Sequence, residues 1–419
     1  MINFIDRLIV GVFNLFSDDA RKWTKKLSQN KLSENDFIIH DDELCPCGSM
    51  KSFIGCCKQK NDIDPVISPK PTDVIVGERI RKARKNNMIC VHPDKTKCKG
   101  EIKQAHALQN NKIMNLLSEN TGHVYALDKD RNPIIFAEDI ENPIVIREIV
   151  KTSVNSATTE PCFCDYHDNI AFASIEKGAP DFNPSSAEMK FTYAYKAFAF
   201  DYYSSVFEMN NFQELFSQRP YVYTMEDQVV YYRMLQLKRS EFNDVKKFYD
   251  SEILKGTYNG ITTCVVEIPY QIRFAVYAFI APDFDLDGKC LENTVNGIMH
   301  RIAVTVLPET SKSYVLLSCM DDEYEIYKGF FEQIRLAHID KVLFCFSLIL
   351  PLYSENIVLS PSLWESYNGK QQFAILHMVN LFGIDMMNMS RTLSFAMQNI
   401  AKKKDYDYSK RLGADLFNV

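Results

Sequence analysis

The sequence predicts an α+β protein, and three observations lead to that fold class. Cysteine and histidine residues gather in two groups before residue 170, in a part of the chain with few long apolar runs. Helical periodicity follows over residues 186–259. Runs rich in β-branched residues then alternate with turn signals over residues 260–419, which is typical of an antiparallel sheet with helices. At 419 residues the chain is too long for one ordinary core, so several units are expected.

Residues 1–43 are expected to form N-terminal helices. Apolar residues recur at helical spacing over residues 1–16, but Asp6 and Arg7 interrupt them and no cleavage pattern follows, which argues against a signal peptide. We expect a docking or core helix, with a helix lying on a membrane surface as the alternative. No run approaches the roughly 20 apolar residues of a membrane span. The sequence therefore predicts a cytoplasmic protein, in which clustered cysteines hold metal rather than form disulfides.

The first cysteine group predicts a small zinc knuckle over residues 44–60. Four thiols, Cys45, Cys47, Cys56 and Cys57, fall within thirteen residues. A tetrahedral zinc ion accepts four thiolates at about 2.3 Å and orders a segment that is too short to have a core. Glycines 48 and 55 would provide the tight backbone that brings the two cysteine pairs together.

The second group predicts another zinc site, in a module over residues 74–185 that follows a proline-containing linker. Its members come in two bursts about 60 residues apart, which suggests one site closed by a long insertion. A Cys-x-x-His pair places two ligands on neighbouring positions of a helical face. The preferred ligands are Cys90, Cys98, Cys164 and His167, and the residues held in reserve are His92, His106 and Cys162.

The remaining elements are predicted from periodicity. Residues 186–259 are expected to be helical, with many aromatic side chains that pack in the core. The expected strands are 261–268, 272–280, 302–307, 314–319 and 342–350, with an amphipathic helix over 323–338 and one or two closing helices over 371–404. Asp287-Gly288 suits a tight turn. The four isolated cysteines are interpreted as small buried hydrophobic residues: Cys264, Cys290, Cys319 and Cys345.

The knuckle resembles the SEC-C zinc motif, best known from the tail of the bacterial preprotein-translocation ATPase. The Cys-Pro-Cys-Gly-Ser start at Cys45 and the paired Cys56-Cys57 end match that motif at all four ligand positions. The resemblance implies one bound zinc ion and a surface that contacts partner proteins, ribosomes or lipid.

The second module resembles the HNH-type treble-clef zinc modules of bacteria. The matching pieces are Cys90…Cys98, Gln104-Ala105-His106 and Phe163-Cys164-Asp165-Tyr166-His167. Together with Gly122–Tyr125 and Ile175-Glu176, they resemble a bacterial family without a settled function, some of whose members carry SEC-C motifs. This wider resemblance covers roughly residues 44–205.

The HNH resemblance implies a nuclease. His106 would be the general base that activates water, and Asp168 and Asn169 would lie near a catalytic Mg²⁺ or Mn²⁺ ion. The sequence departs from the nucleases in two respects: Ala105 stands where many of them have a metal-binding Asp, and the Gly-Gly-x-Asn loop is absent. A zinc scaffold without a second ion is the alternative.

The charge is unevenly distributed. The chain has a net charge of −6, yet residues 1–112 carry 20 Lys and Arg against 14 Asp and Glu, a local charge of +6. An expected helix in this part carries the basic residues Arg79, Arg81, Lys82, Arg84 and Lys85. These charges cover more than half of the helix surface, so they suit either contact with phosphate backbones or a solvated face.

Two classes of function follow. The first is a zinc protein that binds or cleaves nucleic acid, of the kind found among phage-defence and toxin effectors. The second is a non-catalytic zinc scaffold or adaptor that docks onto a protein partner or the ribosome. The first is favoured, with catalysis left open.

Overall fold

The computed structural model describes residues 33–63, 70–108, 110–128, 134–135, 145–176, 178–381, 383–403, 405–410 and 414–417. The expected helices of residues 1–43 lie largely outside this part, in which only the 3-10 helix η1 (Glu34–Phe37) represents them. The chain divides into two compact units: one comprises Met1–Asn87, Tyr202–Phe248 and Thr294–Met299, and the other comprises Met88–Asp201, Tyr249–Asn293 and His300–Val419. The division falls inside two long helices, α6 (Ala187–Gln218) and α7 (Glu226–Lys255), which confirm the helical prediction for this stretch.

The first unit packs the zinc-knuckle segment on aromatic side chains of α6 and α7. Phe53 of the knuckle meets Phe216 edge to face, with ring centroids 6.0 Å apart, and Phe212 stacks on Tyr232 at 5.2 Å. The same unit contains α3 (Thr72–Asn86), the 3-10 helix η4 (Val222–Thr224) and a hairpin of β9 (Thr294–Val295) and β10 (Ile298–Met299). Helical aromatics thus supply the core that the short knuckle lacks.

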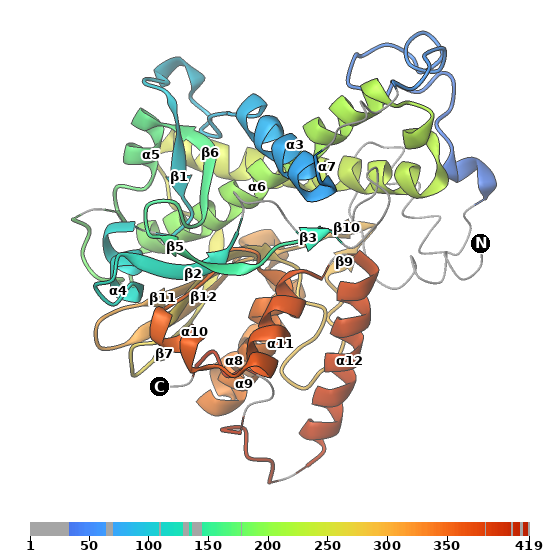
Figure 1. Ribbon diagram of the computed structural model, residues 1–419. Coiled ribbons are helices and arrows are strands. Elements are labelled where there is room, and N and C mark those ends of the chain that lie inside the picture. Colours follow the sequence, from blue (N-terminus) through green and yellow to red (C-terminus); the bar gives the residue numbers. More distant parts are fainter. Residues whose placement is uncertain are drawn as a thin grey trace. The chain divides into compact units, whose positions relative to one another are not determined.

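The second unit is built on a seven-stranded sheet in the order β5-β2-β13-β8-β11-β12-β7, in which every neighbouring pair is antiparallel. This confirms the predicted antiparallel sheet. Figure 1 labels β5, β2, β11, β12 and β7 of this sheet. Its strands are β2 (His123–Leu127), β5 (Ile149–Ser153), β7 (Ile261–Ile268), β8 (Phe274–Ile280), β11 (Ile302–Pro308), β12 (Ser313–Met320) and β13 (Ile357–Leu359). Two of these, β2 and β5, come from the expected module over 74–185, so that segment shares a sheet with residues 260–419.

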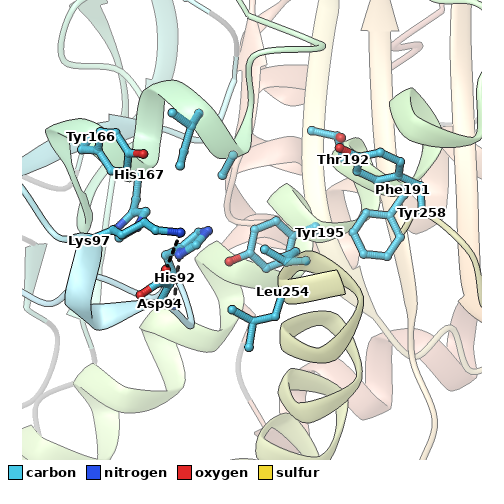
Figure 2. A pocket seen from close by; sticks show the side chains of 13 residues that line it. His92, Asp94, Lys97, Tyr166, His167, Phe191, Thr192, Tyr195, Leu254 and Tyr258 are labelled. Atoms are coloured by element: carbon cyan, nitrogen blue, oxygen red, sulfur yellow. Dashed lines mark hydrogen bonds and ion pairs between the residues drawn. The ribbon is translucent and has the colours of Figure 1, made fainter. Parts of the chain in front are cut away.

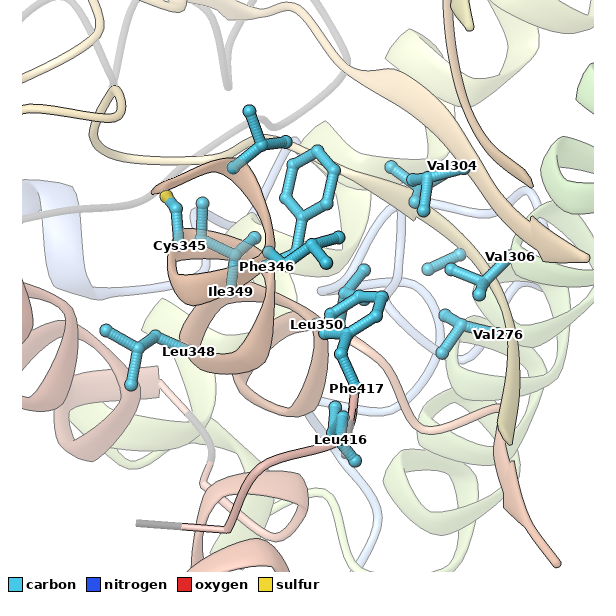
Figure 3. Packing of buried hydrophobic residues seen from close by; sticks show 14 of the residues in the cluster. Val276, Val304, Val306, Cys345, Phe346, Leu348, Ile349, Leu350, Leu416 and Phe417 are labelled. Carbon is cyan, nitrogen blue, oxygen red and sulfur yellow. The ribbon is translucent and has the colours of Figure 1, made fainter. Parts of the chain in front are cut away.

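Helices cover both faces of this sheet. The N-terminal half of α6 packs on one face, where the ring of Phe198 lies 5.3 Å from that of Phe279. On the opposite face, alternate residues such as Val276 join the core formed with α8 (Tyr324–Leu336) and α9 (Ile339–Tyr353) (Figure 3). Coverage of both faces explains why β8 and β11 are buried along their whole length rather than at alternate positions.

The strand predicted over 342–350 is wrong, because these residues belong to helix α9. Val342 to Leu352 are all buried and Ser347 is the one polar residue among them, so the run lacks the spaced polar positions that would reveal a period of 3.6 residues. A short apolar run with no periodicity fits a buried helix as well as a buried strand. The other four predicted strands are confirmed within a few residues, as is the helix predicted over 323–338.

The C-terminal helices are α10 (Pro361–Ser366), α11 (Gly369–Val379) and α12 (Gly383–Ala401), of which the last two are the predicted closing helices. The Asp287-Gly288 turn is also confirmed, because Gly288 has φ +77°. Cys290 is exposed, contrary to the prediction, since it lies on the loop after this turn, whereas Cys264, Cys319 and Cys345 are buried as expected.

The 3-10 helix η5 (Asp321–Glu323) leads into α8. The other remaining elements of the second unit lie before α6. They are η2 (Lys95–Lys97), β1 (Ile102–His106), the π-helical turn η3 (Asn110–Met114), α4 (Asn115–Leu117), β3 (Ile134–Ile135), β4 (Val145–Ile146), β6 (Thr159–Cys164) and α5 (Asp165–Ala171). None of the helices in the described part of the chain has the length and apolar character needed to cross a membrane.

Candidate metal centres

The structure brings the four thiols of the knuckle together. The ligand atoms of Cys45, Cys47, Cys56 and Cys57 all lie within 4.8 Å of one another. The Cys56 Sγ is 3.6 Å from the Cys47 Sγ and 3.7 Å from the Cys57 Sγ. Four sulfurs at about 2.3 Å from a central ion form a tetrahedron with edges of about 3.8 Å. The four thiols therefore have the spacing of a tetrahedral metal site.

Tight backbone geometry makes this spacing possible. The Cys45 N–H donates to the Lys51 carbonyl at 2.7 Å, which closes the loop that contains Cys47. Within it, Gly48 has φ +76°, a conformation that disfavours a side chain. A Cβ atom at Gly48 would also lie 2.8 Å from the Gln213 side chain. The turn thus favours glycine at this position, whereas the flexible end of the Gln213 side chain could move to accommodate a Cβ atom.

The thiols of the knuckle compete for ionisation. Burial, reinforced by the neighbouring thiols, raises the pKa of Cys57. Burial also opposes ionisation of Cys47, but hydrogen bonds from Ser49 and Cys45 outweigh it and lower the pKa of that thiol to about 7. A bound cation would relieve this competition, because it stabilises all four groups as thiolates.

The second group is assembled by a strand–strand–helix unit. Strand β1 pairs antiparallel with β6, and α5 begins directly after β6. Cys164 is the N-cap residue of α5, so His167 follows one turn into the helix. The loop that carries Cys90 and Cys98 is held against β6, since the Val91 N–H donates to the Cys162 carbonyl at 2.8 Å.

His167 lies at the centre of this second group. Its Nδ1 is 3.4 Å from the Cys90 Sγ, 3.5 Å from the Cys98 Sγ and 3.3 Å from the Cys164 Sγ. These separations suit a metal ion with tetrahedral coordination by three thiolates and one imidazole nitrogen. Burial, together with the thiol of Cys90, raises the pKa of Cys98 to about 11, as expected when several thiols share a site without a cation.

Two of the reserve ligands, His92 and Cys162, lie beside this group rather than in it. The ring of His92 stacks on that of His167, with centroids 3.8 Å apart, and its Nδ1 accepts a hydrogen bond from the Asp94 N–H. Cys162 is fully buried, and burial raises its pKa well above the ordinary value. Neither residue belongs to the four-residue group, so Cys90, Cys98, Cys164 and His167 are the residues that can hold a metal ion here.

The three residues expected to be catalytic occupy different environments. His106 ends β1 and is half buried, and burial followed by the charge of Lys196 lowers its pKa. Burial raises the pKa of Asp168 on α5, although the charge of Lys196 opposes this. Asn169 is exposed, and its amide donates to the Asp165 carbonyl and carboxylate. Neither His106 nor Asp168 belongs to a group of three or more His, Cys, Asp or Glu residues that could hold a metal ion in the described part of the chain.

An ion pair between a buried lysine and a partly exposed glutamate, near His106 and Asp168, was missed by the sequence reasoning. The Lys196 side chain is 1% exposed, donates to the Glu176 carboxylate and lies 4.7 Å above the Phe172 ring. Both members of the pair influence the pKa of His106 and that of Asp168. The signal was a single lysine within an apolar aromatic run, residues 191–200, where a charge must find a partner.

Comparison with protein-family models, with curated proteins and with solved structures gives no match for this chain. Functional inference therefore rests on the two Cys/His groups and their surroundings.

Proposed function

We propose that this chain is a zinc protein that binds nucleic acid. The observation that carries the proposal is the Cys₃His group on the β1–β6–α5 unit. Cysteine thiolates with or without one histidine are the ligands of closed structural zinc sites, and no open position remains once four ligands bind. Both groups have this composition, so each would hold one zinc ion that stabilises the surrounding fold.

Exposed lysines around the second site support contact with phosphates. Lys95, Lys97, Lys99 and Lys103 are all exposed near the Cys98 ligand, on a stretch of only nine residues. In the other unit, α3 carries the basic residues predicted from the sequence: Arg79, Arg81, Lys82, Arg84 and Lys85. Clustered lysines and arginines bind nucleic acid mainly through its backbone, with little dependence on sequence.

Binding is better supported than cleavage. The lowered pKa of His106 leaves a neutral imidazole, which suits a general base. However, its Nε2 is buried without a hydrogen-bond partner in the described part of the chain, out of reach of a water nucleophile. The nearby cation is the buried Lys196, already paired with Glu176. A nuclease with Mg²⁺ or Mn²⁺ at Asp168 and Asn169 is therefore the second candidate, and an effector role in phage defence rests on the family resemblance alone.

One set of measurements tests the proposal. Elemental analysis of the full chain should find two zinc ions per molecule, and a labelled 20-base-pair duplex should bind at low salt. Plasmid and RNA should remain intact with added Mg²⁺ or Mn²⁺. Cleavage that is lost in His106→Ala but kept in His123→Ala, a control at an exposed histidine of β2, would establish the nuclease instead. Absence of bound zinc or of nucleic-acid binding would refute the proposal.

The knuckle itself favours a second role, as a docking surface for protein. Its apolar side chains Leu44, Met50 and Ile54 are 57%, 76% and 46% exposed. Co-sedimentation with ribosomes tests the specific partner that the SEC-C resemblance implies. A variant with Met50→Asn and Ile54→Asn should lose co-sedimentation, whereas Leu336→Asn, at an exposed leucine of α8, should keep it.

A further inference from the structure

A cavity of about 250 Å³ lies beside the second metal centre, within the second unit. One end is polar and is formed by His92, Asp94 and Lys97, and the other contains Phe191 and Tyr258, with Tyr195 between the two ends (Figure 2). Phe191 and Tyr195 are buried and form its floor. His167 also lines the cavity, so the hollow borders the candidate metal centre, but the three cysteines of that centre do not line it.

The open part of the cavity is apolar. Ile170 is 45% exposed, Leu254 is 62% exposed and Tyr258 is 37% exposed, and all three line the hollow. The Tyr258 ring is held in place edge to face against Phe191, with centroids 5.7 Å apart. These side chains form a partly exposed apolar wall, to which Tyr258 contributes an aromatic ring.

The polar end offers a donor and an acceptor side by side. The Lys97 ammonium lies 3.0 Å from the Asp94 carboxylate, and the Lys97 side chain is 64% exposed. Lys97 belongs to the group of exposed lysines that we assign to phosphate contact. A ligand in the cavity would thus have a planar apolar part, hydrogen-bonding groups at its edge and a nearby phosphate.

We propose that this cavity binds one unpaired nucleobase of a single-stranded nucleic acid. The inference rests on the proposed function, since it names the substrate class of the same surface. A nucleobase stacks on aromatic rings through its face and forms hydrogen bonds through its edge, and its phosphate stays in reach of lysines. In a duplex both faces are stacked and the edge is paired, so only an unpaired base can enter. The cavity is below the roughly 300–1,000 Å³ of sites for drug-sized ligands, which fits a single base.

The test compares four proteins and three kinds of probe. The proteins are the unmodified chain, Ala171→Phe, Tyr258→Leu and the control Ala173→Phe. Ala171 lines the cavity, so phenylalanine there would fill it, whereas Ala173 is exposed and lies outside the lining. Tyr258→Leu keeps apolar volume but removes the aromatic face. The probes are a mixed-sequence 12-nucleotide single strand, its duplex, and the four ribonucleoside monophosphates. Zinc content confirms that each variant retains its fold.

We expect the single strand to bind the unmodified chain about 10-fold more tightly than the duplex, which is the gain in affinity that stacking of one base provides. Ala171→Phe and Tyr258→Leu should lose this preference and keep duplex affinity, and Ala173→Phe should behave like the unmodified chain. A further outcome is that monophosphates bind the unmodified chain as tightly as the single strand does but do not bind Ala171→Phe, in which the cavity is filled. That result would identify free nucleotides as the ligands of the cavity. A preference that survives in both cavity variants would overturn the inference. If neither duplex nor single strand binds at low salt, the proposed function is refuted. The base-binding cavity is then refuted as well, unless the monophosphates bind.

Discussion

Cys164 and His167 show how single residues locate the second metal centre. Cys164 caps α5 and His167 lies one turn later, so the start of one helix sets the distance between two ligands. Cys90 and Cys98 come from a loop more than 60 residues away in sequence. Loss of any one of them leaves an incomplete tetrahedral site.

Replacing a ligand should destabilise the protein far more than replacing a buried cysteine of the sheet. Cys90→Ser should lower the melting temperature and release one zinc ion, because metal binding contributes directly to folding. Cys264→Ser is the control, at a buried thiol that makes a long contact of 4.0 Å with the Phe331 carbonyl and interacts with Arg335. Differential scanning calorimetry with zinc analysis measures both effects. Equal shifts for the two variants would contradict a metal site at Cys90.

A second prediction concerns the ion pair of Lys196 and Glu176. Glu176→Leu should destabilise the chain by about 3 kcal/mol, because it leaves a buried ammonium without its carboxylate. The double variant Glu176→Leu with Lys196→Met should recover most of the lost stability, because neither position of the ion pair then carries a charge. Asp244→Asn breaks the exposed pair with Lys247 and should cost less than about 1 kcal/mol. Urea unfolding of the four proteins provides the comparison, and a double variant as unstable as Glu176→Leu would be inconsistent with this account.

At the scale of elements, we expect the order of the knuckle to depend on a bound metal ion more than that of the sheet does. The knuckle contributes few residues to the core of its unit, whereas β11 and β12 are paired over six residue positions and almost entirely buried. Most of the order in residues 44–60 should therefore come from the bound ion.

Metal removal should accordingly unfold the knuckle first. Treating the full chain with a strong chelator should abolish hydrogen-exchange protection at Cys45 and Phe53, whose N–H groups donate to the Lys51 and Glu43 carbonyls. Protection at Val306 and Val315 of the sheet should persist. Because the ligands bind as thiolates, lowering the pH should weaken metal binding and produce the same pattern. Unchanged protection at Cys45 after complete metal removal would show that packing alone orders the segment.

At the scale of the whole molecule, the uneven charge predicts how nucleic-acid binding responds to salt. The net charge of −6 opposes binding at long range, so the local excess of +6 in residues 1–112 must act at close range. Affinity for duplex DNA should fall with a slope of about −0.9 per phosphate contact in a plot of log K against log salt concentration.

Reversing charges on α3 tests its share of this binding. Arg81→Glu with Arg84→Glu should weaken binding equally for unrelated sequences and flatten the salt dependence, because backbone contacts carry no base information. The control variant reverses the charges of Lys328 and Lys255, which lie outside the two surfaces proposed for contact with phosphates. Titration by fluorescence anisotropy at several salt concentrations gives both slopes. An unchanged slope in the α3 variant would assign the contact to the lysines of the second unit.

The sequence by itself determined the parts of this protein that depend on local spacing. Four thiols within thirteen residues indicate a knuckle, because ligands so close in sequence can meet without help from the rest of the chain. Alternating apolar runs with turn signals likewise gave the antiparallel sheet. Only the tertiary structure decided what depends on distant partners. It showed that residues 342–350 form a helix rather than a strand. The sequence of a segment buried on every side has no helical periodicity of apolar and polar residues that would distinguish the two. The tertiary structure also showed that Lys196 is buried against Glu176, and that β2 and β5 complete the C-terminal sheet. These features arise from contacts between residues far apart in the chain, which sequence spacing does not encode.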